Sequence, residues 1–97
     1  MTALRLVSLD IEDANTYDEY RRRMAPLLER HGGHFVLDVE GGIARIHPAP
    51  FDPGRVLLIA FPSEGDARAF FSDPEYTAVR SQWFDRAVSQ THAQALP

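Results

Sequence analysis

The stretch "RVLLIAF", residues 55–61, constrains the fold of this chain more than any other. Six consecutive apolar residues follow its arginine, the turn-rich segment "PAPFDPG" precedes it, and Pro62 ends it. Alternate side chains of a strand point to opposite faces, so this run presents apolar groups on both. It therefore predicts a central strand of a sheet that is covered on each side.

Hydrophobic periodicity predicts further strands and two helices around this run. Residues 3–11 are apolar with two alternating faces, which is typical of a strand. The segment "EDANTYDEY" opens a helix, with Asp13 or Asn15 as its N-cap. Pro26 lies inside the apolar stripe of that helix, where it should kink the helix.

The segment "RHGGHF", residues 30–35, predicts the corner that follows this helix. Gly32 suits the left-handed position after a helix C-terminus, and Gly33 frees the chain to turn. A metal site would need both imidazoles to converge with further ligands, yet His47 and His92 lie far away in the sequence. We therefore expect a structural corner and no metal site.

The second strand is predicted over residues 34–40, where polar and apolar side chains alternate. Gly41-Gly42 predicts a bulge or bend, after which residues 43–47 resume the strand. Strict alternation predicts that an apolar set faces the helices and a polar set faces a partner sheet or solvent. The apolar set is Phe35, Leu37 and Val39, and the polar set is His34, Asp38 and Glu40.

The second helix is predicted in two pieces. Ser63 with Asp66 resembles a capping box at the start of the first piece. Asp73-Pro74 then restarts a helix, with Asp73 as N-cap and proline at the first position. The tail "SQTHAQALP" predicts a weak final strand. The order is β-α-β-β-α-β in a single domain over residues 1–97.

This order and three motifs resemble the DUF1330 family within the dimeric α+β barrel superfamily. The motifs are "YDEYRRRMAPLLERHGG", "RVLLIAFPS" and "ARAFFSDPEY", and the resemblance spans nearly the whole chain. It implies an α+β, ferredoxin-like monomer with an antiparallel sheet, which dimerises through that sheet. It implies no established reaction. The chain departs from the family pattern at Ala60, where members commonly carry Glu, and at His34 and Trp83, where they often carry Arg.

Composition excludes several classes of protein and site. The net charge of −4 argues against a general nucleic-acid binder, which needs a basic field. The chain has no cysteine, so disulfides and thiolate metal sites are excluded. No run approaches the ~20 apolar residues of a membrane span, and the N-terminal segment lacks a signal-peptide pattern. We expect a cytoplasmic protein with no cofactor and no membrane partner.

The charged residues and the aromatic residues each offer a candidate functional site. The run Arg21-Arg22-Arg23 fans out around a helix and is predicted to be a solvated face, paired with Asp18 and Glu19. The aromatic residues at helical spacing are predicted to be chiefly core. The alternative is an aromatic pocket between helices and sheet, as in other branches of the superfamily. Tyr20, His34 and Trp83 are then the predicted ligand-binding residues, because each adds a polar tip to an apolar element.

Three functions remain open from the sequence. The first is a small homodimeric protein that binds an apolar or aromatic metabolite without chemistry. The second is a cofactor-free oxygenase or isomerase, and the third is an accessory dimer with no ligand. No evident acid–base pair supports the enzyme, so binding is preferred.

The two apolar faces of the central strand predict a homodimer built sheet against sheet. Both helices of a β-α-β-β-α-β monomer cover one sheet face and leave the other bare. Alternate residues of the central strand point to opposite faces, with Val56, Leu58 and Ala60 on one and Leu57, Ile59 and Phe61 on the other, so the bare face also carries large apolar groups. A contiguous apolar patch of that size is unusual on a monomer. A second copy of the same sheet would cover it, because two-fold symmetry makes the surface complementary to itself.

Overall fold

The computed structural model describes residues 2–40 and 54–96, in the predicted order of strands and helices. No helix in these two ranges is both long and apolar enough to cross a membrane. The elements are β1 (Ala3–Ile11), α1 (Ala14–Arg30), β2 (His34–Glu40), β3 (Arg55–Phe61), α2 (Glu64–Ser72), α3 (Pro74–Val79), a π-helical segment η2 (Arg80–Phe84), α4 (Asp85–Ala87) and β4 (Val88–Leu96).

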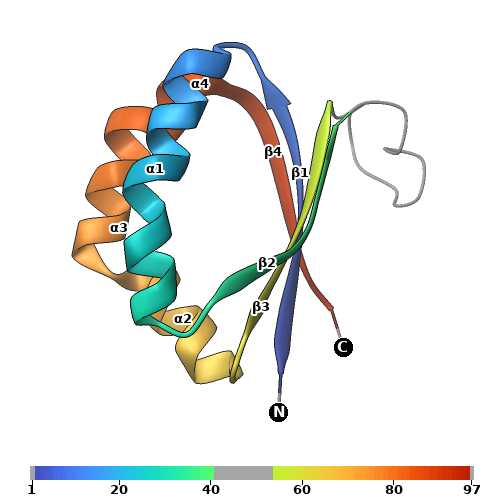
Figure 1. The fold of residues 1–97 in the computed structure, drawn as a ribbon, viewed down its shortest axis with the longest axis vertical. Helices are drawn as coiled ribbons and strands as arrows, with labels where there is room; N and C mark the ends of the chain where they lie inside the picture. Colours follow the sequence, from blue (N-terminus) through green and yellow to red (C-terminus); the bar gives the residue numbers. More distant parts are fainter. Residues whose placement is uncertain (1, 41–53, 97) are drawn as a thin grey trace.

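The four strands form one antiparallel sheet in the order β2-β3-β1-β4. The helices all lie on one side of this sheet (Figure 1). The arrangement is the α+β, ferredoxin-like fold that the sequence implies. The predicted central strand, β3, lies between β1 and β2 as expected. Its side chains Leu57, Ile59 and Phe61 belong to the core under the helices.

The predicted N-cap of α1 is Asp13, which accepts a hydrogen bond from the backbone N–H of Thr16 at 3.1 Å.

The helix-to-strand corner at "RHGGHF", at the other end of α1, is confirmed. Gly32, directly after the C-cap of α1, has a φ of 75°, a left-handed conformation that favours glycine. A Cβ on Gly33 would lie 2.5 Å from the Leu28 side chain, so this glycine permits close packing of the turn.

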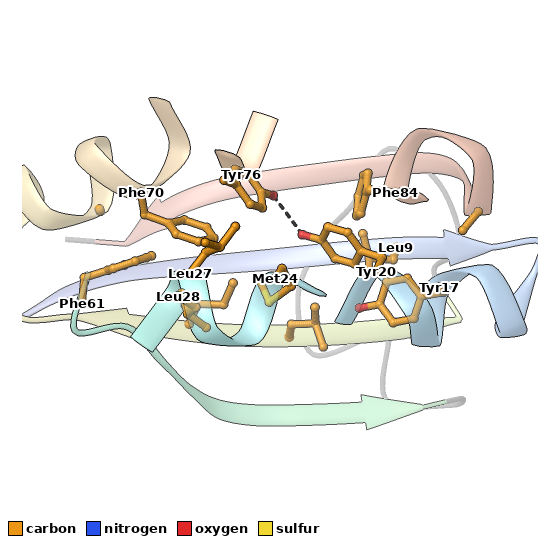
Figure 2. Close-up of a cluster of buried hydrophobic side chains, with 14 of the residues drawn as sticks. Leu9, Tyr17, Tyr20, Met24, Leu27, Leu28, Phe61, Phe70, Tyr76 and Phe84 are labelled. Carbon is orange, nitrogen blue, oxygen red and sulfur yellow. Dashed lines mark hydrogen bonds between the residues drawn. The ribbon is translucent and has the colours of Figure 1, made fainter. Parts of the chain in front are cut away.

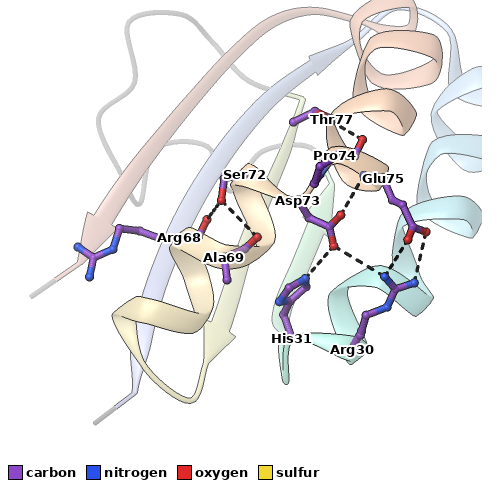
Figure 3. Close-up of polar contacts among 9 residues, drawn as sticks. All are labelled: Arg30, His31, Arg68, Ala69, Ser72, Asp73, Pro74, Glu75 and Thr77. Carbon is purple, nitrogen blue, oxygen red and sulfur yellow. Dashed lines mark hydrogen bonds and ion pairs between the residues drawn. The ribbon is translucent and has the colours of Figure 1, made fainter.

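The second helix is interrupted at Asp73, as predicted. The Asp73 carboxylate accepts a hydrogen bond from the Glu75 backbone N–H at 2.9 Å and thereby caps α3. The same carboxylate lies 2.9 Å from His31 Nε2, which joins the end of α1 to this break (Figure 3). Ser63 caps α2 as predicted, since its Oγ accepts from the Asp66 backbone N–H at 3.1 Å, and its hydroxyl also donates to the Asp66 carboxylate at 2.8 Å. The π-helical turn of η2 was not predicted.

A β-bulge in β2 makes the predicted alternation wrong. Phe35 pairs with Ile59 of β3, but Leu37 pairs with the next residue, Leu58, so Val36 is the extra residue. The predicted bend at Gly41-Gly42 lies outside the described residues.

The bulge exchanges the two faces of β2 beyond it. Asp38 pairs with Leu57 and therefore lies on the helix side, whereas Leu37 and Val39 share the opposite face with Leu58 and Val56. We call this opposite side the open face. No described helix lies on it. Its apolar residues are Leu4, Leu6, Leu37, Val39, Val56, Leu58 and Ala60.

Candidate functional site

A cavity of about 80 Å³ lies between the helices and the sheet. One water needs roughly 10–15 Å³ on this measure, so the cavity has room for a small organic group. Apolar and aromatic side chains make most of its wall, and a few polar groups are set among them. The lining residues are Val7, Leu9, Tyr17, Tyr20, Arg21, Met24, Phe35, Leu57, Ile59, Phe70, Phe71, Tyr76, Arg80, Phe84, Thr91 and Ala93.

Two tyrosine hydroxyls meet at this cavity. Tyr20 of α1 and Tyr76 of α3 are both buried, and their hydroxyl oxygens lie 2.9 Å apart (Figure 2). Phe84 packs edge-on against the Tyr20 ring at 4.9 Å, and Phe70 packs against the Tyr76 ring at 4.2 Å between centroids. Aromatic packing from two other helical segments, α2 and η2, therefore fixes where the hydroxyl pair lies.

These tyrosines are hydrogen-bonding groups rather than bases. Burial raises the pKa of Tyr76 and raises the pKa of Tyr20 well above its ordinary value. Burial likewise raises the pKa of Tyr17. All three phenols are therefore protonated at neutral pH and can donate a hydrogen bond.

Arg21 lies on the cavity wall, which corrects the prediction of a solvated arginine face. Its guanidinium donates to Asp38 at 2.9 Å and stacks 3.9 Å from the Phe35 ring centroid. Arg55 also donates to Asp38, at 2.7 Å, and this hydrogen bond is the main reason that the pKa of Asp38 is lowered. The bulge makes this cluster possible because it turns Asp38 toward the helices. Arg22 pairs with Glu19 at the protein surface.

Arg80 is the second cationic group on the cavity wall. It is the first residue of η2, and its guanidinium lies 4.9 Å from the Phe84 ring centroid. Its ion pair with Asp85 is long, at 3.8 Å, and both side chains are substantially exposed. Arg80 also acts on Tyr76, because its charge and hydrogen bonding oppose the rise in the pKa of that hydroxyl.

The cavity opens toward the edge strand β4. Thr91 and Ala93 line it from β4 and are exposed, and Val7 of the neighbouring strand is half-buried. Its opposite end is closed by buried side chains such as Leu57 and Ile59. A small molecule could therefore enter beside β4 without displacing a core element.

The cavity wall carries no carboxylate or imidazole for proton transfer, and the described residues form no cluster of metal ligands. None of the cavity-lining residues is Asp, Glu or His. Across residues 2–40 and 54–96, no three His, Asp or Glu side chains are grouped to hold a metal ion. The arrangement supplies an apolar space with hydroxyl and guanidinium donors.

The three sequence-predicted ligand residues do not come together. Tyr20 lines the cavity. His34 begins β2, pairs with Ala60 and lies on the open face. Trp83 packs beside the core with its Nε1 buried without a hydrogen-bond partner, and the Arg23 guanidinium lies over its ring at 4.6 Å. Neither His34 nor Trp83 is among the residues that line the cavity.

Sequence reasoning missed the two cavity arginines and the role of Tyr76. Arg21 was grouped with its neighbours in the sequence, although a period of 3.6 residues turns it toward the sheet with Tyr17. Arg80 follows the apolar stripe of α3, and the π-helical turn alters the phase of the residues after it. Tyr20 and Tyr76 lie on separate helices that are far apart in the sequence. No local sequence pattern therefore predicts that their hydroxyls meet.

Solved structures share this fold. A protein of unknown function from Rhodopseudomonas palustris superposes with a TM-score of 0.81 and 21% identity, covering 98% of this chain and 80% of the other. SnoaB, a cofactor-independent oxygenase from Streptomyces nogalater, superposes at 0.68 with 14% identity, covering 99% and 91%. A dimeric ferredoxin-like protein of unknown function from Thermobifida fusca superposes at 0.63 with 11% identity, covering 99% and 90%.

These likenesses define the class of the chain as the ferredoxin-like α+β fold found in dimeric barrel proteins. The family model of DUF1330, a domain of unknown function, matches residues 2–92. The chain belongs to this family. No curated protein matches it significantly.

Proposed function

We propose that this protein is a homodimer that binds a small apolar or aromatic molecule in the cavity between its helices and its sheet. The cavity itself carries the proposal. Protein interiors are close-packed, and voids larger than a water molecule are few in a domain of this size. A void of about 80 Å³ with aromatic walls and an open side therefore suits a ligand.

The polar groups of the cavity support binding over catalysis. Tyr20 and Tyr76 offer hydroxyl donors, and the surrounding wall is largely aromatic and aliphatic. The raised pKa of Tyr20 leaves it protonated, so it can orient a ligand but is a poor base. Of the three residues predicted from the sequence, we keep Tyr20 as a ligand contact.

A titration with toluene tests the binding proposal. Toluene matches the apolar wall and carries no polar group, so it probes the cavity alone. We expect saturable shifts of the backbone amide NMR signals of residues around the cavity, including Thr91 and Ala93. Shifts that do not saturate, or that spread over the open face, would contradict the proposal and favour the accessory dimer without a ligand.

The open face supports the dimer. Leu37 and Val36 are 43% and 53% exposed, and Leu4, Leu6 and Leu58 are half-buried on or beside the same surface. The β2 bulge enlarges this apolar surface because it turns Leu37 and Val39 onto it. A second copy of the sheet would remove this surface from water. Sedimentation at micromolar concentration should give twice the mass of the 10.9 kDa chain, and a stable monomer would contradict this.

A cofactor-free oxygenase is the second candidate, because SnoaB shares the fold. The aromatic cavity suits a substrate that itself activates dioxygen. The test is oxygen uptake with a small electron-rich phenol, measured with an oxygen electrode. Uptake that depends on the protein and stops when the cavity is filled would establish this candidate in place of simple binding.

A further inference from the structure

We infer that the ligand is a small acid, whose apolar body fills the cavity and whose carboxylate binds Arg80 and the Tyr20–Tyr76 hydroxyl pair. This inference rests on the proposed function, because it names the class of ligand for the same cavity. Three observations carry it: the proton count of the hydroxyl pair, the weak pairing of Arg80, and the presence of both groups on the wall of the same cavity.

The hydroxyl pair has one donor more than its own hydrogen bond uses. Each phenol carries one O–H, and the 2.9 Å contact between Tyr20 and Tyr76 uses one of the two protons. The second O–H is buried, and no described residue is placed as its acceptor. A buried donor without a partner costs free energy, so an oxygen acceptor from a ligand in the cavity would relieve that cost.

Of the two arginines on the wall, Arg80 has hydrogen-bonding capacity to spare. Arg21 donates to Asp38 at 2.9 Å, and that carboxylate is held by Arg55 as well. Arg80 reaches its acid, Asp85, only at 3.8 Å, with side chains that are 42% and 59% exposed. Such an exposed, long ion pair is weak. Arg80 can therefore present its guanidinium to a bound anion.

The position of Arg80 fits a carboxylate held next to the hydroxyl pair. Its guanidinium lies over the Phe84 ring, and that ring packs edge-on against Tyr20, so the charge lies near the hydroxyl pair on the cavity wall. A guanidinium and a hydroxyl can donate to the oxygens of one carboxylate. Because the Arg80 side chain is 42% exposed, an anion that it holds keeps some hydration and avoids the full cost of burial.

Three small compounds that share a benzene ring and differ in charge and polarity test the inference. Benzoate, benzamide and toluene share a ring, and only benzoate carries a charge. Amide NMR titrations at pH 7 should show benzoate binding about tenfold or more tightly than benzamide, the gain of a charge-assisted hydrogen bond. Arg80→Gln should remove this preference, so that benzoate binds no more tightly than benzamide. Arg80→Lys should keep part of it.

A matched control separates the local role of Arg80 from general charge. Arg86→Gln removes the same charge from the exposed face of the adjacent α4 and should leave the benzoate preference intact. If toluene binds and benzoate shows no preference, the inference is overturned while the proposed function stands. If the preference persists in Arg80→Gln, the assignment of Arg80 is overturned. If no probe binds to the cavity, both fall.

Discussion

Filling the cavity should make the protein more stable and abolish binding. The substitution is Ala93→Leu, because Ala93 lies on β4, faces the helices and lines the open side of the cavity. A larger side chain there has an empty space to enter. Its carbon atoms would contact the apolar wall and occupy the volume that a ligand needs.

The gain in stability follows from the carbon atoms that become buried. Each buried methylene contributes about 0.8 kcal/mol, so leucine could add up to ~2 kcal/mol to the free energy of unfolding. Partial exposure of Ala93 in the structure places the expected gain nearer ~1 kcal/mol, which raises the Tm of a domain of this size by about 4–8 °C. Natural proteins can keep such a cavity when function requires it.

Urea unfolding and a toluene titration of the same sample measure both effects. Ala95→Leu is the matched control, because Ala95 lies on the same strand and faces the same side but does not line the cavity. The control should bind toluene normally and gain little stability. Loss of more than ~1 kcal/mol in Ala93→Leu would indicate overpacking of a site that is already full, and normal toluene binding by this variant would show that the cavity is not the site.

Three further predictions concern assembly, the helix break and the bulge. Leu58→Asp places two charges in the proposed interface, which should weaken the dimer about a hundredfold or more in sedimentation, whereas Gln82→Asp on the helical side should not. Asp73→Ala removes the cap of α3 and the partner of His31, and should lower the Tm by several degrees, unlike Asp18→Ala on α1. The His31 hydrogen bond lowers the pKa of Asp73 in the folded protein, so the stabilisation by Asp73 is present at neutral pH and should be lost as the pH falls below about 4 in pH-dependent thermal melts. Deleting Val36, the unpaired residue of the bulge, should keep the pairs Phe35–Ile59 and Leu37–Leu58, so Asp38 should retain Arg21 and Arg55 and the free energy of unfolding in urea should change little; a large loss would contradict this reading of the register.

The elements that local chemistry determines were predictable from the sequence. The bounds of β1, β2 and β3, the cap at Asp13, the left-handed Gly32 and the restart at Asp73-Pro74 each have a cause within a few residues. The fold followed from the order of these elements and from the family resemblance. It is confirmed by the sheet order and by the solved structures.

The site depended on features that local chemistry does not fix. A single extra residue in β2 reversed the faces of Leu37 and Asp38, and nothing in the composition of "HFVLDVE" marks the bulge at Val36. An alternating pattern assigns side chains to faces only if the strand pairs regularly, so it cannot predict where a bulge interrupts the pairing. Tyr20 was predicted because its type suits a ligand contact, but the meeting of Tyr20 with Tyr76 depends on how α1 and α3 pack.

The crystal structure of the protein soaked with bromobenzene tests the central claim most directly. Anomalous scattering from bromine locates the ring without reference to side-chain density. The account predicts a bromine site inside the cavity, between the Tyr20–Tyr76 pair and Ala93, in each subunit of a sheet-to-sheet dimer. A cavity that excludes the probe while its walls close to contact, or a bromine bound only at the open face, would contradict the account.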